Sequence, residues 1–192
     1  MISAISGGEV QVTNRADKQS FEPSFSPNGD WIVFESHPLD VEEEGVITKY
    51  KLDGTLGYIE LSDPSENLKQ PNWSPAGDKI VYQKQESDAW DIWVMDIDGS
   101  NKTKLTTNGE STDASFSSDG NWIYYSSGGE GIEHANIFKI ATLGGSPVQI
   151  TNSDNYDGAP CVSPDGTKLA FEGFYKDPDR SSGTKLCIID LQ

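Results

Sequence analysis

The chain has 192 residues, of which 34% are hydrophobic, and no run of about 18 apolar residues that could span a bilayer. Its formal net charge is -17 and its isoelectric point is near 4.3. This charge repels phosphate backbones and anionic lipid headgroups, so it argues against nucleic acid as a partner and against membrane insertion. A basic surface on another protein, or a metal ion, fits it better.

Residues 1–12, MISAISGGEVQV, have neither a basic start nor a continuous apolar stretch, so they do not form a signal peptide. We therefore expect a cytoplasmic protein as written, or a periplasmic one if an export signal has been removed.

The first predicted element is a short strand, VQVT, at residues 10–13. A longer pattern follows at residues 24–34, SFSPNGDWIVF, and it returns as NWSPAGDKIVY, SFSSDGNWIYY and CVSPDGTKLAF. Each copy has a serine at the same place, and these serines are 48, 43 and 46 residues apart: Ser26, Ser74, Ser117 and Ser163. Such spacing is a repeat period.

Each copy predicts two strands joined by a tight turn. Glycine follows the turn serine by three residues, where the turn needs a positive φ. We therefore expect positive φ at four glycines: Gly29, Gly77, Gly120 and Gly166.

Four strands are predicted in every repeat, and we name them a, b, c and d. Strand a ends at the turn serine and b follows it, while c is VITKYKL, DIWVMDI, NIFKIAT or KLCIIDL. Strand d is short: VQVT, YIEL, TKLT or VQIT. The predicted units, in one domain of residues 1–192, cover about 20–62, 69–107, 112–152 and 158–192 plus 9–14.

Four short strands in a period of this length predict an all-β propeller of four-stranded antiparallel blades. The stretch Pro71–Tyr82, PNWSPAGDKIVY, followed by DIWVMDIDG at 91–99 and KLT at 104–106, closely resembles the TolB-type, WD40-like propeller repeat. This resemblance covers essentially the whole chain. It implies a bacterial protein-interaction platform, or the non-catalytic part of a peptidase, usually with six blades.

The chain begins with a strand d and stops after a strand c, so the spare strand matches the missing one. We expect residues 10–13 to complete the fourth blade and close a four-bladed ring, because an open sheet edge promotes aggregation. Two alternatives stay open. The first strand could complete a blade of another copy in a strand-swapped oligomer, or the blades could form an open arc.

The sequence has no G-x-S-x-G nucleophile elbow, and its only histidines are His37 and His134. Both histidines fall in predicted b-to-c loops, where we expect ordinary solvated residues. The only arginines, Arg15 and Arg180, are too few for a sialidase-type carboxylate site. Paired carboxylates are numerous, but no pair is singled out, so we expect no catalytic residues.

One set of polar residues has a shared position, four residues before each turn serine: Glu22, Gln70, Asp113 and Ala159. In a propeller these positions face the central channel. The oxygens of the first three, with Asp157 nearby, could hold a cation such as calcium or a basic side chain of a partner. The alternative is that they only bind water and backbone. No other cofactor is expected.

Four tryptophans recur at strand positions that pack between blades, so we expect them in the core: Trp31, Trp73, Trp93 and Trp122. Trp90 ends an acidic loop and could be either core or an exposed anchor. The b-to-c loops differ most between repeats, and they carry four acidic residues that we assign to partner binding: Glu42, Glu43, Glu44 and Asp88.

From these patterns we expect a non-enzymatic module whose acidic loop face binds a basic surface of a partner protein. The alternative is a propeller that binds a carbohydrate or small ligand at the channel mouth with a divalent cation, with hydrolase- or lyase-like chemistry as one form of it.

Overall fold

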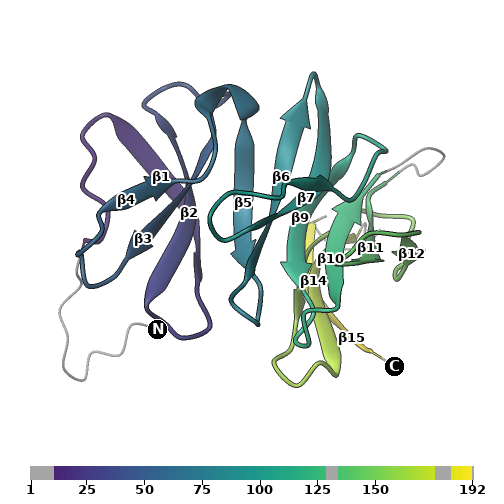
Figure 1. The fold of residues 1–192 in the computed structure, drawn as a ribbon. Helices are drawn as coiled ribbons and strands as arrows, with labels where there is room; N and C mark the ends of the chain where they lie inside the picture. Colours follow the sequence, from purple (N-terminus) through teal and green to yellow (C-terminus); the bar gives the residue numbers. More distant parts are fainter. Residues whose placement is uncertain (1–10, 129–133, 176–182, 192) are drawn as a thin grey trace.

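The computed structural model describes residues 11–128, 134–175 and 183–191, without the side chain of Tyr175. Four antiparallel sheets follow one another along the chain as a row of neighbouring blades, of which the last two overlap in the view of Figure 1. The all-β propeller architecture predicted from the repeat is confirmed. In the described residues no helix is long and apolar enough to cross a membrane.

Blade 1 consists of β1 (Lys18–Phe25), β2 (Trp31–Pro38), β3 (Val46–Lys51) and β4 (Tyr58–Glu60). A short 3-10 helix, η1 (Pro64–Glu66), leads into blade 2, which is β5 (Leu68–Trp73), β6 (Lys79–Glu86), β7 (Ala89–Asp96) and β8 (Thr103–Lys104).

Blade 3 consists of β9 (Ser111–Phe116), β10 (Trp122–Ser127), β11 (Asn136–Ala141) and β12 (Val148–Gln149). Blade 4 has three strands in the described residues: β13 (Asp157–Val162), β14 (Lys168–Tyr175) and β15 (Gly183–Asp190). The first strands of successive blades, β1, β5, β9 and β13, contact one another, so they form the inner side of the row.

The blades are held together by three apolar clusters, one between each pair of neighbours. Because side chains alternate along a strand, β6 sends Ile80 and Tyr82 toward blade 1 and Val81 toward blade 3. Trp73 is buried, and the other three recurring tryptophans are partly buried against these clusters, which confirms their core assignment.

The turn serine is the centre of every a-to-b hairpin. In blade 2, the Oγ of Ser74 accepts hydrogen bonds from the backbone N–H groups of Asp78 and Lys79 and donates to the Asp78 carboxylate. The same Oγ also accepts the N–H five residues ahead in the other three blades. The four turn glycines have φ between 72° and 78°, as predicted.

A second hydroxyl ends each complete blade. The Oγ1 of Thr106 accepts the N–H of Ile92 at 2.9 Å, and the residue before it, Leu105, donates its N–H to the Ile92 carbonyl. Blades 1 and 3 repeat this arrangement with Ser62 and Thr151. The hydroxyl therefore satisfies a strand c donor where strand d ends.

The structure does not show the predicted closure by the first strand. Val10 lies outside the described residues, and Gln11–Asn14 form no strand. This segment lies at blade 1 instead: the N–H of Asn14 donates to the Tyr58 hydroxyl at 2.9 Å, and that hydroxyl donates to the Val12 carbonyl. Nearby Arg15 pairs with Glu60.

The expectation that His37 is a solvated loop residue is wrong. Strand β2 extends to Pro38, and the His37 ring is stacked on Phe21, with 5.1 Å between ring centroids. The side chain is only 4% exposed. His134 does lie exposed between β10 and β11.

Candidate functional site

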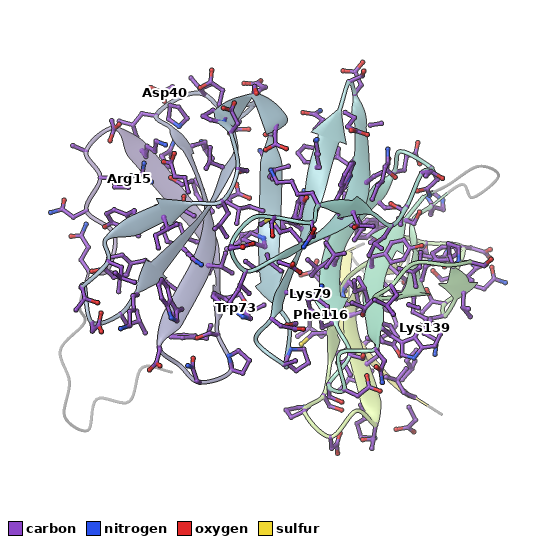
Figure 2. The ribbon with its side chains drawn as sticks, viewed as in Figure 1. Arg15, Asp40, Trp73, Lys79, Phe116 and Lys139 are labelled. Carbon is purple, nitrogen blue, oxygen red and sulfur yellow. The ribbon has the colours of Figure 1, made fainter. Side chains whose placement is uncertain are left out.

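The two sides of the propeller differ in what they carry. The d-to-a and b-to-c connections lie on the same side and hydrogen-bond to each other in blades 1 and 3, as Leu39 N–H to the Asp17 carbonyl and Gly128 N–H to the Glu110 carbonyl. We call this side the loop face and the opposite side, with the a-to-b and c-to-d turns, the turn face. In Figure 2, Asp40 marks the loop face and Lys79 lies toward the turn face.

The four channel positions predicted from the repeat are at a β-bulge in every inner strand. Pairing with the second strand shifts register at this point in all four blades. Each residue has a left-handed backbone, with φ from 48° to 56°: Glu22, Gln70, Asp113 and Ala159. A bulge changes the direction of a side chain, and a positive φ is uncommon in residues other than glycine. The backbone at these four residues therefore adopts an unfavourable conformation that sets the direction of their side chains.

Side chains from successive blades form a continuous polar rim at these bulges. The Nε2 of Gln70 donates to Oε1 of Glu22 at 3.4 Å, and the N–H of Asp113 donates to Oε1 of Gln70 at 3.2 Å. Ala159 contributes no polar atom. In its blade, the hydroxyl of Tyr156 interacts with the Asp113 carboxylate and with Ser126. We call Glu22, Gln70, Asp113 and Tyr156 the mouth cluster.

A second layer supports this rim from strand b. The buried carboxylate of Glu35 accepts the N–H of Gln70 at 3.0 Å through Oε2. One blade on, Oε1 of buried Gln83 accepts the N–H of Asp113 at 3.3 Å. Both residues stand nine positions after their turn serine, so in blades 1 and 2 the repeat supplies an acceptor for the bulge of the next blade. In blade 3 the residue at this position, Ser126, instead donates its hydroxyl to the Asp157 carbonyl.

The mouth cluster concentrates negative charge. Partial burial raises the pKa of Glu22 above its ordinary value, although the side chain reaches solvent, and the nearby carboxylates of Glu35 and Asp113 raise it further. The hydrogen bond from Gln70 and the charge of Lys69 oppose this shift. A positive charge placed beside Glu22 would therefore relieve repulsion among three acids.

This raised pKa sets a pH dependence. Because the folded state holds the pKa of Glu22 above its unfolded value, protonation favours folding, and this stability is present in acid and lost as the pH rises through the folded pKa. We expect Glu22→Gln to raise Tm at pH 7 by about 1 to 2 °C, the scale of a surface substitution, and to leave Tm unchanged near pH 4. Thermal unfolding at both pH values measures this, with Glu42→Gln as the control. A lower Tm at pH 7 would contradict it.

The expected cation site is not formed by acidic groups alone. Among the described residues, no three His, Cys, Asp or Glu side chains are placed to hold a metal ion together. Asp157 is buried rather than exposed at the rim, and its Oδ2 accepts a hydrogen bond from Ser153 at 2.9 Å. Calcium binding at Glu22, Gln70, Asp113 and Asp157 remains a prediction.

The four acidic loop residues are exposed on the loop face: Glu42, Glu43, Glu44 and Asp88. None of them forms an ion pair with any residue in the described part of the chain. Trp90 is half-buried, and the ammonium of Lys69 lies over its ring, 5.9 Å from the centroid. Trp90 is thus tied into blade 2 more than a freely exposed anchor would be.

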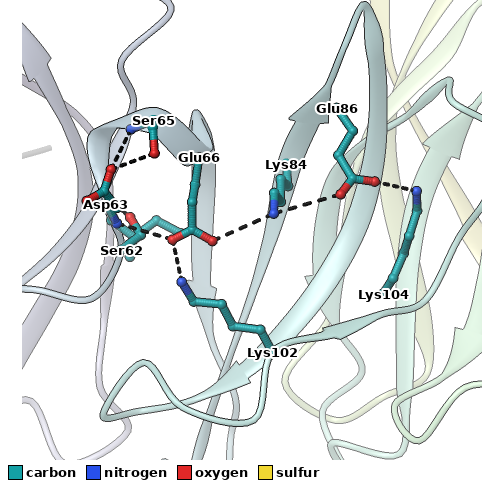
Figure 3. A network of polar contacts seen from close by, with 9 residues as sticks. Ser62, Asp63, Ser65, Glu66, Lys84, Glu86, Lys102 and Lys104 are labelled. Carbon is teal, nitrogen blue, oxygen red and sulfur yellow. Dashed lines mark hydrogen bonds and ion pairs between the residues drawn. The ribbon is translucent and has the colours of Figure 1, made fainter.

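Other acids of this face are already paired with lysines. Figure 3 shows Glu66 of η1 between Lys102 and Lys84, at 2.5 and 3.6 Å, and Glu86 bound to Lys104 at 2.7 Å. Lys104, with a smaller contribution from Lys84, lowers the pKa of Glu86. In the described residues, negative charge without an ion pair therefore remains in the mouth cluster and at the four acidic loop residues.

Two residues of the site were missed at the sequence level. Glu35 could have been found from its place nine residues after the turn serine, where Gln83 stands in the next repeat. Tyr156 had no such signal, because it reaches the rim from a loop of variable length.

Comparisons with known proteins agree with this architecture. The profile of the family described as TolB beta propeller domain matches residues 1–181. Uncharacterized protein Atu1656 of Agrobacterium fabrum is 32% identical over 139 residues, which are 72% of this chain and 47% of that protein.

Two solved structures share the fold at low sequence identity. TolB from Acinetobacter baumannii has a TM-score of 0.73 at 20% identity, covering 91% of this chain and 41% of that one. Oligogalacturonate lyase from Vibrio parahaemolyticus has a TM-score of 0.68 at 17% identity, covering 93% and 53%. The chain thus spans about half the length, or less, of these proteins.

Proposed function

Because the chain belongs to the TolB β-propeller domain family, we propose that it acts by binding and not by catalysis, with its loop face holding a basic segment of a partner protein. The similarity to a lyase at 17% identity bears on the fold alone.

The observation that carries the proposal is the unbalanced charge of the mouth cluster. Glu22 lies beside Glu35 and Asp113, with Lys69 as the opposing charge; partial burial raises the pKa of Glu22, and repulsion from the two acids raises it further. A lysine or arginine side chain of a partner would relieve this repulsion and could also donate hydrogen bonds to the Gln70 and Tyr156 side-chain oxygens.

The acidic loop would extend the same surface. Glu42, Glu43 and Glu44 stand exposed between β2 and β3, and Asp88 stands between β6 and β7. Charges at the rim of a binding surface mainly attract the partner and set its orientation, whereas the partly desolvated mouth cluster would contribute more to how long it stays bound. The two groups therefore give distinct expectations.

The test uses a labelled lysine- and arginine-rich peptide as the probe, titrated by fluorescence anisotropy at about 0.05 M and about 0.2 M salt. We expect binding that weakens as salt rises. The mouth variant, Glu22→Gln with Asp113→Asn, and the loop variant, with Glu42, Glu43 and Glu44 to Gln and Asp88→Asn, should each weaken binding about fivefold or more.

A matched control removes the same number of charges from the turn face: Asp30, Asp53, Asp98 and Asp190, each to Asn. If this control weakens peptide binding as much as the loop variant does, the binding reflects net charge and the loop face is not the site. A rise in Tm with calcium or manganese that Asp113→Asn abolishes would instead favour the cation-dependent alternative.

A further inference from the structure

Each of the two end blades of the row has exposed apolar residues on its outer face. On blade 1, Phe21 and Phe25 are 44% and 64% exposed. On blade 4, Leu186 and Ile188 of β15 are 86% and 66% exposed. In blade 2 the residues equivalent to Leu186 and Ile188 are Ile92 and Val94, counted by strand pairing, and both are buried against blade 3. The fold normally covers these positions with another blade.

Blade 1 has the counterpart of the surface that covers them. The residues of blade 3 that pack on Ile92 and Val94 occupy four repeat positions: Ala114, Phe116, Ile123 and Tyr125. The same positions in blade 1, counted from the turn serine, are again apolar: Pro23, Phe25, Ile32 and Phe34. The end face of blade 1 therefore matches the end face of blade 4 in the way that blade 3 matches blade 2.

This face of blade 1 is hollowed. A pocket of about 300 Å³ is lined by Pro23, Phe25, Ile32 and Phe34 together with Val12. Between blades 2 and 3 the corresponding space is filled by Ile92, Val94 and Leu105. The pocket is therefore of the kind that aliphatic side chains fill when two blades pack.

Strand β15 is paired with β14 on one side. In each of blades 1 to 3, one strand c residue is hydrogen-bonded to the end of strand d: Ile47, Ile92 and Ile137. Its carbonyl accepts a backbone N–H from the end of strand d, and its own N–H donates to the hydroxyl that ends the blade. Leu186 holds this place in blade 4. Within the described residues, no strand pairs with the outer side of β15. An open strand edge is a template for another strand.

Residues 11–13, Gln-Val-Thr, have the features of the strand that is lacking. In blade 3 the corresponding residues are Gln149, Ile150 and Thr151, where Nε2 of Gln149 donates to the Thr151 carbonyl at 2.8 Å. Nε2 of Gln11 donates to the Thr13 carbonyl at 2.7 Å. The segment thus has the sequence and the local hydrogen bond of an outer strand, but it forms no strand in the structure.

We propose that two copies of this chain associate head to tail, blade 4 of one packing on blade 1 of the other, whose residues 11–13 become the fourth strand on β15. A second copy is the occupant because both partner surfaces are in this chain but lie at opposite ends of its row of blades (Figure 1). Residues 11–15 are held at blade 1 by Tyr58 and Glu60, so they travel with the face that docks. The contact is heterologous, so it forms rings or longer chains.

The proposal fixes a register that a disulfide can trap. Phe138 pairs with Gln149 in blade 3, so Cys187, the equivalent of Phe138, should face Gln11 of the second copy. Such a non-hydrogen-bonded pair has Cα atoms about 4.5 Å apart, within the range of a disulfide. We expect Gln11→Cys with Cys161→Ser to form covalent dimers and multimers under mild oxidation, seen by non-reducing electrophoresis. Val12→Cys, whose side chain points to the other side, should not form them.

Light scattering on the uncrosslinked protein supplies a second measurement. Leu186→Arg should weaken self-association about tenfold or more without unfolding the single chain, because Leu186 is exposed there. The matched control is Leu143→Arg, at a residue 91% exposed in the turn between β11 and β12, and it should associate like wild type.

Three outcomes would overturn the proposal. One is a disulfide that forms only within a single chain, which would mean that the chain closes on itself. Another is a single-copy mass at all concentrations with no disulfide, which would leave the end faces to a different protein. The third is association that survives Leu186→Arg unchanged.

Discussion

Replacing Gly99 by alanine is expected to lower the free energy of unfolding by about 2 to 4 kcal/mol, because two separate costs combine at this residue. Gly99 has φ +87°, which strains any residue with a Cβ. A Cβ there would also stand 2.6 Å from the carbonyl oxygen of Leu61, a backbone atom of blade 1. Because Leu61 is itself hydrogen-bonded to Ile47, it cannot easily move away.

Gly29→Ala separates the two costs. Gly29 has a similar φ of +74°, but nothing lies within 4 Å of the position of its Cβ. This control should lose only about 1 kcal/mol, the cost of the backbone conformation alone. Urea unfolding of both variants measures the difference. Equal losses would show that the approach of Gly99 to Leu61 is not tight in solution.

Much of the fold could be predicted because the same sequence pattern occurs four times in the chain. The spacing of Ser26, Ser74, Ser117 and Ser163 fixes the hairpins, and their hydroxyls make the same backbone bond in every blade. Alternating apolar residues such as Ile80 and Val81 fix which side packs on which neighbour. These features depend on local geometry, which a short sequence window contains.

What could not be predicted depends on contacts between distant segments. His37 is buried because Phe21, from another strand, stacks on it, and nothing in its own surroundings in the sequence indicates this. Residues 11–13 have the pattern of an outer strand, but where they lie is decided by Tyr58 of blade 1. A pattern can specify an element without specifying its partner.

The candidate site was predicted in part for the same reason. The bulge residues Glu22, Gln70 and Asp113 share a repeat position, so their common placement could be inferred from spacing. Their left-handed backbone could not, since none of them is a glycine. Asp157 was placed at the rim by proximity along the chain, but the structure buries its carboxyl under Ser153.

Asp91 is the residue whose loss should affect blade 2 most among the polar groups. Its Oδ1 accepts the hydroxyl of Thr106 at 2.8 Å and the N–H of Gly109 at 3.2 Å, while Oδ2 pairs with Lys104 at 3.0 Å. The side chain is 2% exposed, so water cannot replace it easily. Through Thr106, which caps the N–H of Ile92, it joins strand d and the following loop to strand c.

Asp91→Ala should therefore lower the free energy of unfolding by about 2 to 4 kcal/mol, since it leaves buried donors without an acceptor. Asp91→Asn should lose about 1 kcal/mol or less, because an amide oxygen already does this work in blade 3, where Asn136 accepts the Thr151 hydroxyl. Urea unfolding measures both, and Thr106→Val completes a double-mutant cycle, in which coupling above about 1 kcal/mol is expected. If alanine and asparagine destabilise equally, the charge and its pairing with Lys104 matter more than the hydrogen bonds that join the strands.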